Sequence, residues 1–247
     1  IANLPFPIGK LKVLNLREYN DPNQYLIEKC ADKFTKEWWQ APERRPDGIK
    51  LGKDMLPEIL DRSHSFSVPY PFEGLNKKTY GLRLSELTLI TAETGIGKTS
   101  LFKHFEHALL TNDEIKEKNY GIGFLHLEET NRDTALGLIS IHNSVPYHLP
   151  DAAWVEDDIK RGFDDIINND RVVIWDHFGS NSVDEVVNKV RHMSVMGCKY
   201  IFIDHLSIIV SDQNGDERKQ LDEISTKLKT ITMELELSIC AIIHTNR

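Results

Sequence analysis

The sequence predicts an α/β fold in which a mostly parallel central sheet is flanked by helices. From Ser63 onward, short apolar runs alternate with segments of helical length, which is the pattern of parallel strands joined by crossover helices. The runs do not alternate strictly between polar and apolar residues, as expected for strands that are buried on both faces. The predicted strands span residues 87–92, 121–127, 171–176, 200–210 and 238–244.

Composition agrees with this class of fold. The chain has 247 residues, 40% of them hydrophobic, which is enough for one large α/β domain and an appendage. No run approaches the roughly 18 to 20 apolar residues that span a bilayer, and the N-terminal residues do not resemble a signal peptide. We therefore expect no membrane partner, and a reducing compartment such as the cytoplasm.

The cysteines and the net charge argue against two other classes of protein. Cys30, Cys198 and Cys240 are widely spaced, so neither a disulfide framework nor a zinc site is expected. A net charge of −8 argues against a protein that coats nucleic acid with its whole surface, because phosphate binding needs locally concentrated lysine and arginine. A basic channel inside a ring is compatible with this charge.

Three regions are predicted along the chain. They are an N-terminal region of residues 1–48, a linker region of residues 49–64 and a main domain of residues 65–247. Because the chain begins at Ile1 and ends directly after an apolar run, we expect it to be a fragment.

The first two regions contain short predicted elements. Residues 11–16 have the pattern of a strand and residues 23–39 that of a helix, and the proline and charge cluster that follows resembles a linker. Residues 51–62 form a short amphipathic pattern in which Pro57 must lie in the first turn of a helix. So short a helix is marginal alone, so it must pack either on its own domain or on another molecule.

The strongest motif follows the first predicted strand. The segment Ala92–Thr99 matches the P-loop pattern GxxxxGK[ST], except that Ala92 replaces the first glycine, which an extended backbone tolerates. The remaining glycines turn backbone amides toward a phosphate, Lys98 reaches the terminal phosphates, and the Thr99 hydroxyl binds Mg²⁺. The strand before the motif and the helix after it are the required context. The expected nucleotide-binding residues are Glu93, Thr94, Gly95, Ile96, Gly97, Lys98, Thr99 and Ser100.

Two acidic residues at the ends of other strands complete this prediction. Asp204 follows four apolar residues and is placed to hold the metal ion, although a loop-capping aspartate would show the same pattern. Glu128 follows the strand of residues 121–127 and is the candidate general base for the attacking water. Its neighbour Glu129 should point to the opposite face of the chain, either to solvent or toward a helix N-terminus.

A histidine ends the last predicted strand. His244 is placed to form a hydrogen bond with the γ-phosphate and to respond to its loss, although a lone histidine at this position is more often structural. Other histidines and tryptophans are expected in the core or at the surface, without a role in the chemistry. They are His126, His142, Trp38, Trp39 and Trp175.

Together these motifs resemble those of ring-forming replicative DNA helicases of the phage primase-helicase, mitochondrial Twinkle and bacterial DnaB type, which have a RecA-like P-loop motor domain. The resemblance extends from near Lys10 to the last residue, with four segments in the order and spacing of the family. The segments are EGLNKKTYGLRLSELTLITAETGIGKTS, HLEETNRDTALGLISIHN, YIFIDHLSIIVSDQNGDERKQLDEISTKLKTI and CAIIHTNR.

The resemblance implies a helicase that hydrolyses ATP, dTTP or another nucleoside triphosphate with Mg²⁺ and moves in the 5′–3′ direction on single-stranded DNA. It implies that Lys98 binds the phosphates, that Thr99 and Asp204 bind Mg²⁺, and that Glu128 is the catalytic base. It also implies His244 as the γ-phosphate sensor. That sensor is a histidine in the phage enzymes and a glutamine in the bacterial ones, so the resemblance favours the phage or organellar branch. The expected location is then the host cytoplasm or the mitochondrial matrix and nucleoid.

The DNA-binding residues implied by the resemblance lie in two loops that line a central channel. Arg218 and Lys219 belong to the loop after the Asp204 strand, and Asn246 and Arg247 to the loop after the His244 strand. Acidic neighbours in the first loop fit a solvated surface equally well. The residues after Arg218 have a helical pattern. In the alternative interpretation, Arg218 therefore belongs to the N-terminal end of that helix and does not contact DNA.

The resemblance also implies how the molecule assembles. The N-terminal residues resemble the tail of a TOPRIM primase domain, without its catalytic residues. The linker helix would dock on the adjacent subunit and so close a ring of six or seven copies. The arginine finger of the family comes from that neighbour and lies beyond Arg247. DNA polymerase and other replisome proteins are the expected further partners.

Three other functions share some of these motifs. A RecA-type or clock-type ATPase shares the fold and the nucleotide site but would not unwind DNA. A small-molecule P-loop kinase would need an arginine-rich lid, for which the sequence has no candidate. A non-catalytic nucleotide-binding subunit is favoured only by Ala92, whereas intact Lys98, Thr99, Glu128 and Asp204 argue against it.

Overall fold

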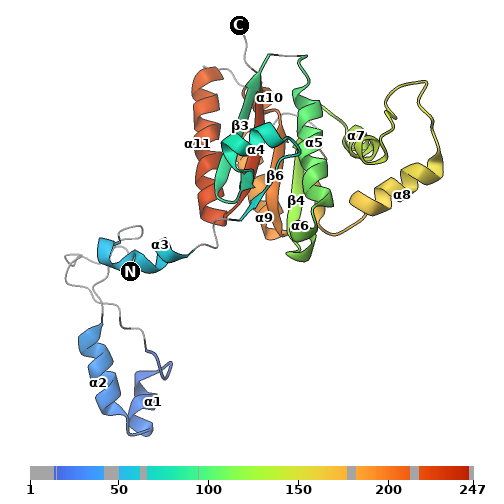
Figure 1. Ribbon diagram of the computed structural model, residues 1–247. Coiled ribbons are helices and arrows are strands. Elements are labelled where there is room, and N and C mark those ends of the chain that lie inside the picture. The colour runs from blue at the N-terminus through green and yellow to red at the C-terminus, as the bar shows by residue number, and fades with distance from the viewer. Residues whose placement is uncertain are drawn as a thin grey trace. The chain divides into compact units, whose positions relative to one another are not determined.

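Figure 1 shows the computed structural model of the chain, which describes residues 14, 16–41, 50–61, 66–93, 95–176, 182–211 and 217–244. The chain divides into two compact units, Ile1–Arg62 and Ser63–Arg247. None of the described helices is long and apolar enough to cross a membrane.

The second unit is built on a five-stranded sheet in which all neighbouring strands are parallel. Its strands are β3 (Glu86–Ala92), β4 (Gly121–His126), β5 (Val172–Ile174), β6 (Cys198–Asp204) and β7 (Ser238–His244). The predicted α/β class with a parallel sheet is therefore confirmed. The strand order is β3-β7-β6-β4-β5. Because the strands are parallel, all their carboxyl ends lie at one edge, where open α/β sheets bind their ligands.

Helices cover both faces of the sheet (Figure 1). They are α5 (Lys98–Thr111), α7 (Asn131–Asn143) and α8 (Glu156–Ile166) on one side, and α9 (Val183–Val195), α10 (Leu206–Ser211) and α11 (Glu217–Leu235) on the other. Phe124 and Phe202 belong to the apolar cluster on the first side, whereas Leu125 and Ile203 belong to the cluster on the second. Burial on both faces explains why these strands lack polar alternation.

One predicted strand is too long. The run of residues 200–210 was given as one strand, although Asp204 was expected at a strand end; β6 ends at Asp204, and α10 begins at Leu206. Leu206 and Ile209 are both fully buried in the second cluster, three residues apart, which is the spacing of a helix face. A mostly apolar run has no period that separates a buried strand from a buried helix, so the sequence did not show that the residues after Asp204 form a helix.

Smaller elements precede β3 and follow α5. They are β1 (Ser67–Val68), α4 (Glu73–Thr79), β2 (Leu82–Arg83) and α6 (Asp113–Glu117). Strands β1 and β2 form an antiparallel pair next to Gly81, which has φ of 87°. A Cβ at Gly81 would lie 2.5 Å from the carbonyl oxygen of Val68, so glycine is required there by conformation and by space.

Residues 22–40 form two helices where the sequence predicted one. The pattern at residues 23–39 forms α1 (Pro22–Ile27) and α2 (Ala31–Gln40), separated at Lys29, whose φ is 56°. The break folds α1 against α2 and buries Tyr25 completely, with its ring 5.7 Å from that of Phe34 and its hydroxyl 2.9 Å from Glu37. Burial of a large aromatic side chain outweighs the helical continuity that the pattern indicated. The predicted strand at residues 11–16 lies mostly outside the described residues.

The predicted linker helix is also shorter than expected. It consists of the 3₁₀ turn η2 (Gly52–Asp54) and α3 (Leu56–Leu60), with Pro57 in the first turn as predicted. Three apolar side chains of α3 are more than half exposed, namely Leu56, Ile59 and Leu60 at 58, 70 and 69%. One turn of helix with an exposed apolar face is not stable by itself in water.

Candidate nucleotide site

The predicted phosphate loop connects β3 to α5. Gly95 and Gly97 have φ of 84° and 91°, a left-handed conformation that favours glycine, and Gly97 is the N-cap residue of α5. Ala92 is the last residue of β3 and pairs with His244 on β7, so alanine fits its extended backbone. The N-terminal amides of α5 therefore follow a loop that can approach an anion closely. Of the predicted nucleotide-binding residues, Thr94 lies outside the described residues.

Lys98 is folded back on this loop. Its ammonium group donates hydrogen bonds to the carbonyl oxygens of Ala92 at 2.8 Å and Glu93 at 2.7 Å, and the residue is only 7% exposed. A buried ammonium group needs such acceptors. Phosphate oxygens are charged and therefore stronger acceptors for the same ammonium group. A bound phosphate can thus replace these two carbonyl oxygens as the partner of Lys98.

Thr99 and Asp204 come together at the carboxyl edge of the sheet. The Thr99 hydroxyl donates a 2.7 Å hydrogen bond to Oδ2 of Asp204, which is 2% exposed. The other carboxylate oxygen of Asp204 is buried and accepts no hydrogen bond from any described residue. A hydroxyl beside an unsatisfied buried carboxylate oxygen is a donor set that suits Mg²⁺ or its bound water. The two residues predicted as metal ligands thus fit the ion chemically.

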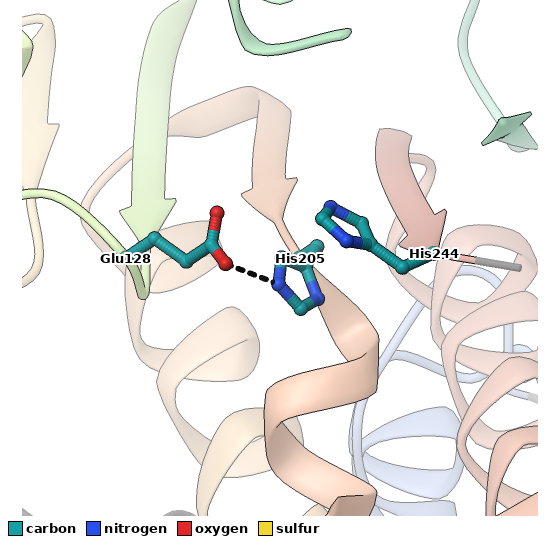
Figure 2. A group of neighbouring side chains, drawn as sticks. All are labelled: Glu128, His205 and His244. Atoms are coloured by element: carbon teal, nitrogen blue, oxygen red, sulfur yellow. Dashed lines mark hydrogen bonds and ion pairs between the residues drawn. The ribbon is translucent and has the colours of Figure 1, made fainter. Parts of the chain in front are cut away.

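Glu128, His205 and His244 form the second cluster at this edge (Figure 2). They follow or end strands β4, β6 and β7, and one ligand atom from each lies within 4.8 Å of the others. Nε2 of His205 lies 2.7 Å from Oε1 of Glu128. The His205 ring stacks on that of His244, with the ring centroids 3.7 Å apart and the ring planes inclined by 23°. The sequence brought Glu128 and His244 to attention, but His205 was missed; its position next to Asp204 was the only available signal.

The stacking of the two rings distinguishes a metal site from a hydrogen-bonding site in this cluster. Two histidines and a glutamate are common metal ligands, but each imidazole nitrogen offers its lone pair in the plane of its own ring. Because the His205 and His244 rings are nearly parallel and 3.7 Å apart, their lone pairs do not converge on one ion. The arrangement is better suited to hydrogen bonding around the reacting phosphate than to a second metal site.

His244 is held by the chain and by its charged neighbours. Its backbone N–H donates a 3.0 Å hydrogen bond to the hydroxyl of Ser207, at the start of α10. Burial lowers the pKa of His244, and the neighbouring His205 and Lys98 lower it further, against the opposite effect of Glu128 and Asp204. The neutral imidazole favoured by this environment can donate one hydrogen bond to an incoming phosphate.

Glu129 does not face solvent, in contrast to one interpretation of the sequence. It lies 2.8 Å from the Lys103 ammonium group on α5 and 3.8 Å from Nδ1 of His126, whose Nε2 is 2.7 Å from the fully buried Glu106. Burial acts to raise the pKa of Glu129, but His126 and Lys103 outweigh it and lower the pKa to about 2. This mostly buried network connects the end of β4 to α5, and Glu128 is the acidic residue beside the His205–His244 pair. The expectation that His126 has a core role is met, through an ion pair rather than apolar packing.

The predicted DNA-binding residues are only partly described. Arg218 and Lys219 lie in the first turn of α11, which begins at Glu217, and both are exposed. Arg218 therefore lies at the N-terminal end of a helix, as the alternative interpretation predicted. Asn246 and Arg247 lie outside the described residues, as does the loop at residues 212–216.

Known proteins share this fold and this sequence pattern. The chain is 27% identical to the DNA helicase/primase of Enterobacteria phage T3 over 96% of its own length, and 27% identical to the replicative DNA helicase DnaB of Helicobacter pylori strain J99 over 73%. It spans only 43% and 37% of those relatives. Two solved structures at 21% identity share the fold. One is an ATPase domain, with a TM-score of 0.63 over 82% of this chain and 73% of that one, and the other is a DnaB-like replicative helicase, with a TM-score of 0.60 over 92% and 57%.

A family model gives the assignment. The model of the DnaB-like helicase C-terminal domain matches residues 67–247, which include the phosphate loop, Glu128, Asp204 and His244. The match covers the whole parallel sheet and its flanking helices. The chain therefore belongs to the DnaB-like helicase C-terminal domain family, the ATPase domain of these replicative helicases.

Proposed function

We propose that this domain is the motor of a ring-forming replicative DNA helicase that hydrolyses nucleoside triphosphate and moves 5′–3′ on single-stranded DNA. The observation that carries the proposal is the meeting of Lys98, the Thr99–Asp204 pair and Glu128 at one edge of the sheet, in a chain of the DnaB-like family. These groups supply a phosphate-binding cation, a metal site and a base, which are the parts that phosphoryl transfer to water requires.

In the proposed reaction, Lys98 leaves the carbonyl oxygens of Ala92 and Glu93 and pairs with the β- and γ-phosphates. Thr99 and Asp204 would hold Mg²⁺, which when bound would neutralise charge on the phosphate oxygens. Water attacks the γ-phosphorus, its proton passes to Glu128, and the bond to the β–γ bridging oxygen breaks. Nucleoside diphosphate and phosphate are the products, and His244 contacts the γ-phosphate until it leaves.

The coupling to DNA is proposed to run through His244. This residue ends β7 directly before residues 245–247, and its N–H is tied to Ser207 on α10, which precedes the loop at residues 212–216. Loss of the γ-phosphate would therefore act on a point that adjoins both proposed DNA loops. Arg218, Lys219, Asn246 and Arg247 are the proposed contacts to the DNA backbone.

The ring is proposed to close through the linker helix. The exposed apolar face formed by Leu56, Ile59 and Leu60 supports docking on an adjacent subunit, which repeated around an axis gives a hexamer or heptamer. We propose that the neighbour also supplies the arginine finger, and that residues 1–48 are the end of a TOPRIM-like primase domain. DNA polymerase and other replisome proteins are the proposed partners; one matched structure is of a DnaB-like replicative helicase and its interactions with primase.

Unwinding by the full-length protein tests this proposal. The substrates are partial duplex DNAs that carry a single-stranded tail at either the 5′ or the 3′ end. The control is Lys98→Ala, which removes the phosphate-binding ammonium group. We expect nucleotide-dependent unwinding only with the 5′ tail, and none with Lys98→Ala. Hydrolysis without unwinding would indicate a RecA-type or clock-type ATPase, and nucleotide binding without hydrolysis would indicate a structural subunit.

A further inference from the structure

His205 contacts both the proposed base and the proposed sensor, although no motif assigned it a role. Figure 2 shows it between Glu128 and His244, with Nε2 2.7 Å from the Glu128 carboxylate and its ring stacked on His244 at 3.7 Å. The three residues come from the ends of different strands, and His205 is the one that touches both of the others.

His205 is the fixed member of its pair with Glu128. It is 5% exposed and lies between Asp204, which ends β6, and Leu206, which begins α10 and is fully buried. The Glu128 side chain is 45% exposed, and its hydrogen bond to His205 is the one that it makes among the described residues. An exposed glutamate has several accessible rotamers, and a single bond to a rigid donor restricts them. His205 therefore sets the position of Glu128 rather than the reverse.

The hydrogen bond also defines which nitrogen of His205 carries a proton. A carboxylate only accepts hydrogen bonds, so Nε2 must be the donor to Glu128. The other nitrogen, Nδ1, is buried and has no hydrogen-bond partner in the described part of the chain. A substitution that removes the Nε2 donor but keeps a planar ring thus separates the bond to Glu128 from the stack on His244.

We infer that His205 is a positioning residue that orients the general base Glu128 and, through its stack on His244, links that orientation to γ-phosphate contact. The inference rests on the proposed function, because it requires Glu128 to act as the base. The stack on His244 supports one face of the His205 ring, so a His244 that is held by a γ-phosphate further restricts the donor that positions the base. The orientation of the base is thus linked to phosphate contact without movement of His205.

Two variants of the full-length protein separate this role from simple packing. His205→Phe keeps the ring and removes the donor, whereas His205→Gln keeps an amide donor at about the reach of Nε2. Misplacement of a catalytic group by about 1 Å costs roughly 100-fold. We expect His205→Phe to lower kcat for DNA-stimulated ATP hydrolysis about 10- to 100-fold, with KM for ATP little changed, and His205→Gln to recover at least about tenfold of that loss.

Two further measurements complete the experiment. In a Glu128→Gln background, His205→Phe should lower kcat by less than about twofold, because residues that act as one unit are not additive. His192→Phe is the matched control, since His192 is an exposed histidine on α9, and it should behave as wild type. Thermal unfolding shows whether each variant is folded; if His205→Phe is not, His205→Asn replaces it, because its amide is one methylene shorter than that of Gln.

The outcomes for His205 and for the proposed function are distinct. Wild-type kcat in folded His205→Phe, or equal losses in the Phe and Gln variants, would overturn the positioning role. An undiminished effect of His205→Phe in the Glu128→Gln background would also overturn it. If instead the wild-type protein hydrolyses no ATP, or Glu128→Gln retains full activity, then the proposed function itself fails.

Discussion

The hydroxyl of Thr99 and the carboxylate of Asp204, which are 105 residues apart in the sequence, are joined by a 2.7 Å hydrogen bond at the carboxyl edge of the sheet. The bond joins the end of β6 to the first turn of α5 and holds the two proposed metal ligands next to each other.

Loss of the Thr99 hydroxyl should therefore weaken the use of Mg²⁺. Thr99→Val keeps the shape of the side chain but removes the oxygen, and we expect hydrolysis to fall about 100-fold or more at moderate Mg²⁺ concentration. Thr99→Ser keeps the hydroxyl and should stay within about tenfold of wild type. Titration of the hydrolysis rate with Mg²⁺ checks both values, and equal Mg²⁺ dependence of the Val variant and wild type would refute the assigned ligand.

His244 should couple hydrolysis to DNA. His244→Ala removes the donor proposed for the γ-phosphate and the ring that stacks on His205. Removal of one such donor costs about 100- to 1000-fold in other enzymes, and we expect a loss of that order in the DNA-stimulated rate, together with loss of unwinding. Parallel hydrolysis and unwinding assays provide the check. Full DNA stimulation with intact unwinding in His244→Ala would rule out the coupling role.

The ion pair between His126 and Glu106 should be essential for stability. Both side chains are almost completely buried, so His126→Leu leaves the Glu106 carboxylate without its partner. We expect a loss of about 3–5 kcal/mol in the free energy of unfolding. The double variant Glu106→Met/His126→Leu removes both charges and should recover most of the loss. Urea unfolding of the single and double variants measures this, and additive losses would contradict a paired charge.

The same network predicts how stability depends on pH. The pKa of Glu129 is lowered to about 2 from its ordinary 4.5, so its contribution is present above pH 4.5 and is lost as the pH falls toward 2. Burial acts to lower the pKa of His126, but Glu106 raises it to about 10 from 6.5. Its contribution is therefore present below pH 6.5 and is lost as the pH rises toward 10. Unfolding free energies measured across this pH range should show a smaller acidic slope in Glu129→Gln and a smaller alkaline slope in His126→Leu.

The sequence was sufficient for the sheet and the phosphate loop because both have strong local signals. Apolar runs without alternation indicated strands buried on two faces, and the spacing of Gly95, Gly97, Lys98 and Thr99 is specific to phosphate binding. Asp204 and Glu128 could be placed because the ends of parallel strands meet at one edge.

Other features depend on long-range packing and were missed. The helix after Asp204 is set by burial of Leu206 and Ile209, and a mostly apolar segment does not separate a buried strand from a buried helix. The break between α1 and α2 is set by the burial of Tyr25. His205 and the Glu129 network depend on contacts between segments 77 and 26 residues apart, respectively, which no local pattern specifies.

The central claim is that Glu128 is the base of a DNA-stimulated motor. It is tested most directly by nucleotide hydrolysis of the full-length protein, with and without unstructured single-stranded DNA, in wild type and Glu128→Gln. The account predicts strong stimulation of the wild type by DNA, and a variant that binds nucleotide but hydrolyses it at least about 100-fold more slowly. A wild-type rate that is unaffected by DNA, or a Glu128→Gln variant that hydrolyses at the wild-type rate, would contradict it.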